Sequence, residues 1–252
     1  MNDLEGKAAI VTGGGSGIGA DLVAQLCASG ASVLAADLNE VGLAGVADRT
    51  GCITRVVDVA SLADNAAMVG AAVVEFGRLD LLFLNAGVLG RSVVDQREPL
   101  TDIAGLADRY RHVMSANVDG VVHGTLAAVD VIEEGGAIVA TASIAGLMAW
   151  APDPAYTASK HGVIGWVRAI APALEARGVT IDAICPSGVA TPLVGASPDM
   201  AEADANRLSP RQVAGAIIVT ALEPGTGRAL SVVAGRSPER LEHEFTDVAG
   251  FS

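Results

Sequence analysis

One tyrosine and one lysine of this 252-residue chain stand four positions apart, as Tyr156 and Lys160. They fall in a stretch expected to be helical, so both side chains should lie on one helix face. Ser143 stands thirteen residues before Tyr156, at the end of an apolar run. A phenol beside an ammonium is suited to moving the proton of a hydroxyl group, and a nearby hydroxyl can hydrogen-bond the same oxygen. The alternative is an ordinary pair on a helix surface.

A second candidate site is the glycine-rich segment Thr12–Gly19, which lies between a strand-like run and a helix-like stretch. Gly13 is expected to permit a tight turn, Gly17 to let the backbone approach a pyrophosphate, and Gly19 to let the helix pack closely. The N-terminus of the following helix would then offer free N–H groups and a positive dipole to the anion. A merely flexible loop is the alternative.

Asp37 closes the next strand-like run, 24 residues after Gly13. A carboxylate at this place accepts hydrogen bonds from the adenosine ribose hydroxyls and repels a 2′-phosphate. The neighbouring Ser16 and Leu38 carry no positive charge that would hold such a phosphate. The pattern therefore predicts NAD as the cofactor. The alternative is that Asp37 only caps the helix that follows.

Short runs of Val, Ile, Leu and Ala alternate with longer stretches along the whole chain. The runs are Ala8–Val11, Ser32–Ala36, Ile53–Val57, Leu79–Leu84, Ala137–Ala140, Thr180–Cys185 and Leu230–Val233. The helix-length stretches are 17–29, 39–48, 61–76, 101–130, 155–176 and 209–222. This alternation predicts an α/β fold: a Rossmann-like, doubly wound, seven-stranded parallel sheet with helices on both faces. We expect one domain over 1–252, and a kink or early end of the 155–176 helix at Pro172.

The formal net charge of −13 makes nucleic acid an unfavourable partner, because a phosphate backbone would be repelled. No apolar run reaches the roughly 18 residues needed to span a bilayer, so no membrane partner is expected. The acidic N-terminus does not resemble a signal peptide. Three scattered cysteines are expected to be buried free thiols of a cytoplasmic protein (Cys27, Cys52 and Cys185).

Several of these motifs, in this order and at this spacing, resemble those of short-chain dehydrogenases/reductases. They are Thr12–Gly19, Asn85-Ala86-Gly87, Asn117, Ser143 and Tyr156-Thr157-Ala158-Ser159-Lys160. The resemblance runs from about residue 5 to 192. It implies a Rossmann fold, a nicotinamide cofactor, a homo-oligomer that is usually a tetramer, and an oxidoreductase with a Ser-Tyr-Lys mechanism.

The resemblance also implies a role for each catalytic residue. Tyr156 is the acid/base, Ser143 hydrogen-bonds the substrate oxygen, and Lys160 also holds the nicotinamide ribose. Asn117 holds a water that relays the proton, unless it is a buried Asn with its hydrogen bonds satisfied by the core. A free tyrosine has a pKa near 10, and the ammonium and a positive nicotinamide both favour the phenolate, so we expect the pKa of Tyr156 to fall.

Other positions match the cofactor contacts of the family. With the glycine turn and the Tyr-Lys pair, the expected contacts are Gly13, Ser16, Gly17, Ile18, Gly19, Asp37, Leu38, Asp58, Val59, Asn85, Ala86, Gly87, Tyr156, Lys160, Pro186, Val189 and Thr191. Three features depart from the family. Ser187 replaces a usual glycine, segment 88–113 is longer than usual, and the closing Asp-Gly-Gly is replaced near Gly235.

These patterns predict an enzyme that transfers a hydride between NAD and a small-molecule secondary alcohol or ketone. A 3-oxoacyl carrier-protein reductase and a non-catalytic NAD-binding sensor or scaffold are the alternatives. The expected substrate walls are apolar: Ile144, Met148, Trp150, Pro152, Leu193, Val194 and Met200. They favour a neutral substrate. Arg91 is either a solvated loop residue or the partner of a charged substrate.

Overall fold

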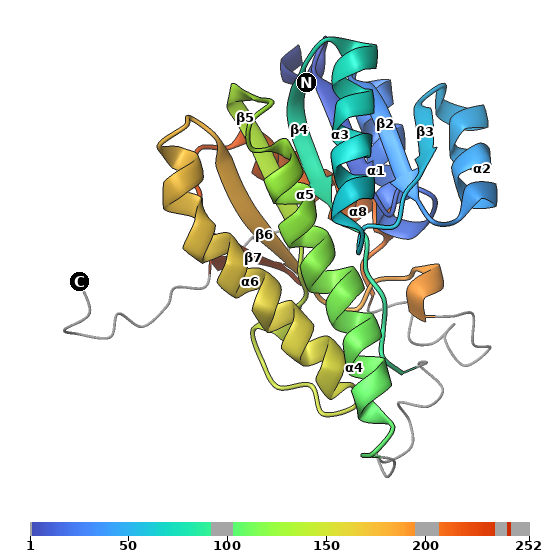
Figure 1. Cartoon of the computed structure of the whole chain (residues 1–252), viewed down its shortest axis with the longest axis vertical. Coiled ribbons are helices and arrows are strands. Elements are labelled where there is room, and N and C mark those ends of the chain that lie inside the picture. The colour runs from blue at the N-terminus through green and yellow to red at the C-terminus, as the bar shows by residue number, and fades with distance from the viewer. Residues whose placement is uncertain (1, 92–102, 195–206, 235–240, 243–252) are drawn as a thin grey trace.

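The computed structural model describes residues 2–91, 103–194, 207–234 and 241–242, and its centre is a single sheet with the order β3-β2-β1-β4-β5-β6-β7-β8 (Figure 1). The strands are β1 (Ala8–Thr12), β2 (Ser32–Asp37), β3 (Ile53–Val56), β4 (Leu79–Leu84), β5 (Ile132–Thr141), β6 (Thr180–Pro186), β7 (Ala229–Val232) and β8 (Leu241–Glu242). The predicted seven parallel strands are confirmed as β1 to β7. The two-residue β8, which was not predicted, pairs antiparallel with β7.

Helices cover both faces of this sheet. They are α1 (Gly17–Ala28), α2 (Glu40–Thr50), α3 (Leu62–Phe76), α4 (Leu106–Met114), α5 (Gly120–Ala128), α6 (Pro154–Glu175) and α8 (Pro210–Leu222). In Figure 1, α3, α5 and α6 lie in front of the sheet, with α1 and α8 behind it. Each layer has its own apolar core, one around Met68, Leu82 and Val167 and the other around Leu22, Phe83 and Ile217. The burial on both faces explains the near-continuous apolar runs of the central strands.

The strand order reverses direction beside β1, because β2 and β3 lie on one side of it and β4 to β7 on the other. Crossovers leave β1 and β4 toward opposite faces at such a point, so a crevice remains at the carboxyl ends of these strands. Ligands of open α/β sheets bind in this crevice. The topology therefore places the candidate site at the ends of β1, β4 and β5.

Three elements differ from their predicted form. Strand β3 was expected to be buried on both faces, but it is an edge strand, and Thr54, Arg55 and Val56 are exposed. Strand β5 begins at Ile132 instead of Ala137, with an irregular register against β4. Helix α6 continues through Pro172 and ends three residues later, at Glu175.

The predicted 101–130 helix is also interrupted. Its described part begins at Leu106, and a π-helical turn, η3 (Ser115–Asp119), separates α4 from α5. Such turns are frequent at functional sites. This turn contains Asn117.

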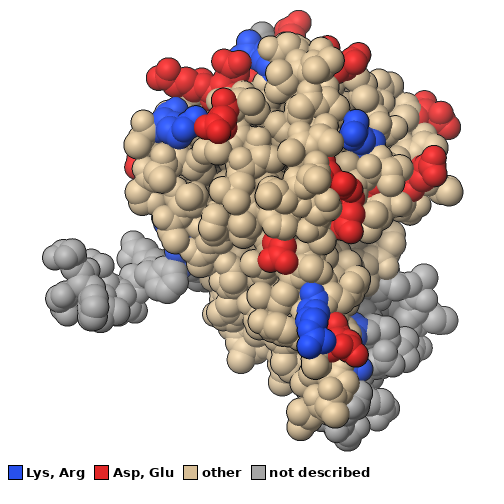
Figure 2. All heavy atoms as spheres, viewed as in Figure 1, with Lys and Arg blue, Asp and Glu red and all other residues tan. Residues whose placement is uncertain are grey.

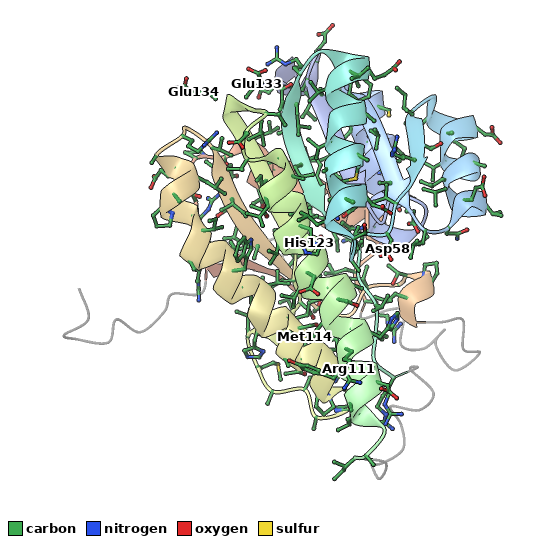
Figure 3. All side chains as sticks on the ribbon, in the orientation of Figure 1. Asp58, Arg111, Met114, His123, Glu133 and Glu134 are labelled. Carbon is green, nitrogen blue, oxygen red and sulfur yellow. The ribbon has the colours of Figure 1, made fainter. Side chains whose placement is uncertain are left out.

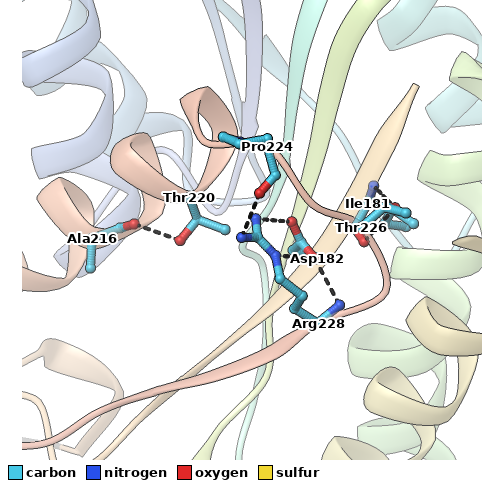
Figure 4. A network of polar contacts seen from close by, with 7 residues as sticks. All are labelled: Ile181, Asp182, Ala216, Thr220, Pro224, Thr226 and Arg228. Carbon is cyan, nitrogen blue, oxygen red and sulfur yellow. Dashed lines mark hydrogen bonds and ion pairs between the residues drawn. The ribbon is translucent and has the colours of Figure 1, made fainter. Parts of the chain in front are cut away.

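A buried ion pair ties β7 to β6 (Figure 4). Asp182 is 2% exposed, and Arg228 contacts both of its carboxylate oxygens, through Nη2 at 2.7 Å and Nε at 3.2 Å. The backbone N–H of Arg228 donates to the same carboxylate at 2.8 Å. Because a buried charge needs a partner, this pair constrains how the last parallel strand joins the sheet.

The substitution Arg228→Met should therefore lower the free energy of unfolding by about 3 kcal/mol, because it leaves the Asp182 carboxylate buried without its guanidinium. Urea denaturation measures the change. The matched control is Arg177→Met, since Arg177 pairs with Asp130 at 3.1 Å and the two side chains are 49% and 82% exposed. The control should lose less than about 1 kcal/mol. Equal losses of unfolding free energy in the two variants would show that the Asp182–Arg228 pair stabilises the protein no more than the exposed pair does.

Candidate active site

A cleft of about 860 Å³ opens at the carboxyl ends of the parallel strands. Residues that directly follow six strands line it: Gly13, Leu38, Val57, Asn85, Ala142 and Ser187. In Figure 3, Asp58 lies at these carboxyl ends of the strands, whereas Glu133 and Glu134 lie at the opposite end of the sheet. The cleft occupies the crevice that the strand order creates.

The cleft brings together nearly all of the residues predicted from the sequence. Its lining includes Gly13, Ser16, Gly17, Ile18, Asp37, Leu38, Asp58, Val59, Asn85, Ala86, Gly87, Ser143, Tyr156, Lys160, Pro186, Val189 and Thr191. Two predicted residues are not in the lining, because Gly19 and Asn117 are buried behind it.

The glycine-rich turn needs its glycines for space as well as for conformation. Gly13 and Gly17 have φ of +66° and +51°, in the left-handed region where side chains are strained. A Cβ on Gly17 would lie 3.1 Å from Cγ2 of Thr191. A Cβ on Gly19 would collide with the carbonyl oxygen of Gly13. The turn is thus packed between β1 and the segment after β6, with Gly19 allowing the close start of α1.

Hydrogen bonds join the ends of β1, β4 and β5 behind this turn. The Thr12 hydroxyl accepts from the backbone N–H of Asn85 at 2.9 Å and of Ala86 at 3.1 Å. The Thr141 hydroxyl donates to Oδ1 of Asn85 at 3.1 Å. The Lys160 ammonium donates to the Thr141 carbonyl at 2.8 Å. Thr12 and Thr141, which were not predicted as site residues, connect the glycine turn to the lysine of α6.

Asp37 faces the glycine turn at the outer end of the cleft, which is the end away from Tyr156. Its Oδ2 accepts from the N–H of Gly15 and its Oδ1 from the N–H of Asn39, both at 2.9 Å. A carboxylate has about four lone-pair sites, so each oxygen keeps one for a further donor. Asp37 therefore shapes the turn and still presents a negative, accepting edge to the cleft. Leu38 beside it is 66% exposed.

Tyr156 lies in the first turn of α6, whose N-cap is Asp153. The Ser143 side chain hydrogen-bonds Tyr156, and the Lys160 ammonium lies 5.5 Å from the centre of the Tyr156 ring. The indole of Trp150 meets the phenol edge-on, with the ring centres 5.8 Å apart. A hydroxyl, a phenol and an ammonium thus converge on one place at the inner end of the cleft.

The expectation that the pKa of Tyr156 falls is wrong for the free protein. Burial raises the pKa to about 12, and the Asp153 carboxylate adds to the rise, while the hydrogen bond with Ser143 opposes it. Burial also lowers the pKa of Lys160, to about 8. Burial disfavours the charged form of each group, and it is the largest cause of both shifts.

Asp153 is a positioning residue that the sequence did not reveal. Its side chain is 1% exposed and accepts three backbone N–H bonds, from Gly90 at 2.7 Å, Arg91 at 3.0 Å and Tyr156 at 3.1 Å. These bonds tie the segment after β4 to the start of α6. The Arg91 guanidinium donates to the Pro152 carbonyl at 2.8 Å and does not line the cleft, so Arg91 matches neither of the two roles considered for it.

Asn117 uses its amide to hold the segment after Gly87. Its Oδ1 accepts from the N–H of Val88 at 2.7 Å. Its Nδ2 donates to the Val88 carbonyl and to the Ser159 hydroxyl, both at 3.0 Å. Both amide protons are engaged, which matches the alternative of a buried, satisfied asparagine. The implied role in a proton relay through water remains a prediction.

The remaining sequence expectations concern the substrate side. Five of the predicted apolar walls line the cleft: Ile144, Met148, Trp150, Pro152 and Leu193. Val194 does not line it, and Met200 lies outside the described residues, as do residues 92–102 of the long segment 88–113. Ser187 avoids the left-handed conformation and instead accepts a hydrogen bond from the Ala234 N–H at 3.3 Å, so no glycine is needed there.

Comparison with known proteins assigns the family. A family model described as short chain dehydrogenase matches residues 7–202. This chain belongs to the short-chain dehydrogenase family. The matched range contains the glycine turn, the strand-end network and the Tyr156–Lys160 pair. These motifs therefore meet in one cleft as parts of one family pattern.

Relatives of this short-chain dehydrogenase are oxidoreductases with different substrates. 3beta-Hydroxysteroid dehydrogenase 2 of Eggerthella lenta is 37% identical over 75% of this chain and 73% of its own length. Cyclohexanol dehydrogenase of an Acinetobacter species is 34% identical over 83% and 82%. The crystal structure of 3-ketoacyl-(acyl-carrier-protein) reductase from Brucella melitensis, complexed with NADH, has a TM-score of 0.82 at 27% identity and covers 93% of this chain and 99% of its own. The chain is therefore an oxidoreductase of a family that uses a nicotinamide cofactor.

The described residues fit such a cofactor. The cleft extends from Asp37 to Tyr156 and has the volume of a pocket for a large ligand. Of the residues of the turn before α1 that line the cleft, Gly13 and Gly17 carry no side chain and Ser16 carries a small one. Among the described residues no group of metal-ligating side chains occurs, and no helix of this part is long and apolar enough to cross a bilayer.

The raised pKa of Tyr156 is testable without any activity. In the variant Tyr110→Phe, Tyr156 is the only tyrosine of the chain, so phenolate absorbance reports on it alone. We expect no phenolate below about pH 11, because the pKa is raised to about 12. A midpoint near the ordinary value of about 10 would contradict the burial of the phenol. Adding Asp153→Asn should lower the midpoint, since it removes a negative charge that disfavours phenolate, while asparagine still caps α6.

Proposed function

We propose that this short-chain dehydrogenase transfers a hydride between NAD and a secondary alcohol or the corresponding ketone. The observation that carries the proposal is the convergence of Ser143, Tyr156 and Lys160 at the inner end of a cleft whose outer end carries Asp37. Ser143, Tyr156 and Lys160 bind the hydroxyl of an alcohol and move its proton. Asp37 selects the cofactor.

In the direction of oxidation, Tyr156 takes the proton of the substrate hydroxyl. A nicotinamide cofactor held by the cleft would supply the hydride acceptor, and its oxidised form would supply a positive charge. Tyr156 needs such a charge, since burial alone holds its pKa at about 12. A nearby positive charge favours the phenolate and moves the pKa toward the working pH, where a base is most effective.

Ser143 and Lys160 support this transfer. The Ser143 hydroxyl hydrogen-bonds the phenol and is placed to donate to the substrate oxygen as charge develops on it. Lys160 has a pKa lowered to about 8 and is still mostly protonated at neutral pH. Its ammonium stabilises the phenolate, and the Thr141 carbonyl fixes its direction at 2.8 Å.

We propose a neutral, largely apolar substrate, because Ile144, Met148, Trp150 and Leu193 form the walls beside Tyr156. Burial of apolar surface on these walls would supply binding free energy at about 25 cal/mol per Å². The second candidate is a 3-oxoacyl carrier-protein reductase, which the likeness to the Brucella melitensis enzyme favours. The acidic chain, with its net charge of −13, is unfavourable for an acidic carrier protein.

We further propose a cytoplasmic homotetramer that forms through α4, α5 and α6, as the family resemblance implies. Two observations support this interface. The middle of the face formed by α3, α5 and α6 shows few charged side chains (Figure 2), and Leu126 of α5 is 48% exposed on the molecule. A monomeric mass in light scattering, against 25.3 kDa for the chain, would contradict the proposal.

A panel of substrates with Tyr156→Phe as the matched control tests the reaction. We expect NAD reduction with neutral secondary alcohols and little turnover of acyl thioesters. The variant keeps the ring and loses only the oxygen, so turnover should fall at least about 10²-fold while NADH binding remains. Oxidation should become faster as the pH rises, since the phenolate is the base. A variant that keeps a tenth of the rate would exclude Tyr156 as the acid/base, and NADH binding without any turnover in the wild type would favour a sensor or scaffold.

The ratio of kcat/KM with NAD to kcat/KM with NADP tests the role of Asp37. We expect a preference for NAD on the order of 10²-fold or more, because an uncompensated carboxylate beside a 2′-phosphate costs a few kcal/mol. Asp37→Asn should reduce the preference, since it removes the charge and keeps the size. Asp58→Asn, at another acidic residue of the cleft, should affect both cofactors equally. An unaltered ratio in Asp37→Asn would show that another group selects the cofactor.

A further inference from the structure

One cation of the cleft has a buried nitrogen that meets no acceptor in the part of the chain that the structure describes. Three basic side chains are among the described residues that line the cleft: His112, Lys160 and Arg207. Lys160 donates to the Thr141 carbonyl. Nη1 of Arg207, in contrast, is buried and has no hydrogen-bond partner among the described residues. A buried guanidinium nitrogen without an acceptor is costly, so the arrangement points to an acceptor that enters with the ligand.

The backbone holds Arg207 against the end of β6. Leu208, the next residue, forms a parallel bridge with Val189. The Leu208 N–H donates to the Gly188 carbonyl at 2.9 Å, and the Ala190 N–H donates to the Leu208 carbonyl at 3.0 Å. Leu208 itself is 4% exposed and anchors this crossing in the apolar core. The position of Arg207 is therefore set by a packed crossing and not by a free loop.

The same crossing leads to the glycine turn. Cγ of Arg207 lies 3.7 Å from the place where a Cβ on Gly188 would stand. Three residues after Gly188, the side chain of Thr191 packs 3.1 Å from the Cβ position of Gly17. A fully extended chain advances about 3.3 Å per residue, so at most roughly 10 Å separate Gly188 from Thr191. Much of that distance is within the span of an arginine side chain.

The charges of the cleft explain why an arginine is needed there. Segment Thr12–Gly19 contains no lysine or arginine, and Ser16 makes no side-chain cap bond at the start of α1. A phosphate at this turn would meet only backbone N–H groups and the helix dipole, in a cleft that also holds Asp37 and Asp58. Charge-assisted bonds from a guanidinium are about twice as strong as neutral ones, and arginine binds paired oxygens with both arms.

We propose that Arg207 binds an anionic oxygen group of the ligand that fills the cleft. The pyrophosphate of the dinucleotide is the source that any nicotinamide cofactor brings, and a carboxylate of the substrate is the other source with the same chemistry. The proposal rests on the binding of a dinucleotide, and not on the choice between NAD and NADP or on a particular alcohol. Arg207 thus supplies a positive charge beside the glycine turn, which has none of its own. The side chain reaches the ligand across the segment that follows β6.

Binding of NADH, followed by its fluorescence in the absence of substrate, tests the proposal. Arg207→Gln should weaken NADH binding on the order of 10-fold or more, and Arg207→Lys should restore part of the loss because it returns the charge. Binding of adenosine, which has no phosphate, should not change. Arg211→Gln is the matched control, since Arg211 is an exposed residue of α8 that does not line the cleft. Unchanged melting temperatures would show that the variants are folded.

A second arm distinguishes the two sources. If NADH binding is unchanged in Arg207→Gln while the KM of hydroxy acids rises tenfold and that of neutral alcohols of similar size does not, the anion is a substrate carboxylate. If neither NADH binding nor any KM changes, or if Arg211→Gln has the same effect as Arg207→Gln, the proposal is wrong. A protein that binds NADH in an Arg207-dependent way and oxidises no alcohol would contradict only the proposed function.

Discussion

The rest of the site depends on the hydrogen bonds that join the carboxyl ends of β1, β4 and β5. Parallel strands end at one edge of a sheet with their last carbonyl and N–H groups unpaired, and these groups need partners when they are buried. Thr12, Asn85 and Thr141 supply the partners to one another. The Thr141 carbonyl is left to accept from Lys160. The position of the ammonium is therefore a consequence of how three strand ends are satisfied.

The site concentrates charge and potential charge in an apolar core. Lys160 and Asp153 are 3% and 1% exposed, and each would be costly to bury without donors or acceptors around it. Lys160 is held by a carbonyl and Asp153 by three backbone N–H groups. Neither is neutralised by a direct ion pair in the described part of the cleft. Tyr156 lies between these two groups in the sequence, and the Asp153 carboxylate contributes to the rise of its pKa.

Two loops and one helix meet at Asp153. The carboxylate fixes the segment after β4, through Gly90 and Arg91, to the first turn of α6. Asn117 fixes the same segment a little earlier, at Val88, from a π-helical turn. A segment held at two points carries less conformational freedom, and the cleft wall that it forms is therefore ordered before any ligand enters. This order lowers the entropy that binding must overcome.

Much of the fold was predictable because its signals are local. The apolar runs that became β1, β4 and β6 are buried on both faces, and a strand in that environment needs no alternation. The edge strand β3 was predicted correctly in place but not in burial, although Thr54 and Arg55 already depart from the apolar composition of a central strand. The π-helical turn at Asn117 was missed because its sequence has no breaker. Asp153 and Arg207 were missed for another reason: their neighbours Gly90 and Gly188 are distant in the sequence, and no spacing connects them.

The sequence by itself determined which groups share a surface. A spacing of four places Tyr156 and Lys160 on one helix face, and a glycine-rich segment between a strand and a helix favours a phosphate-binding turn, because both follow from local backbone geometry. The tertiary structure alone decided how deeply these groups are buried. Burial raises the pKa of Tyr156 in the protein alone, whereas the Lys160 ammonium and a positive nicotinamide together predicted a fall. The reason is that desolvation depends on everything packed around a group, and those neighbours come from strands and loops throughout the chain.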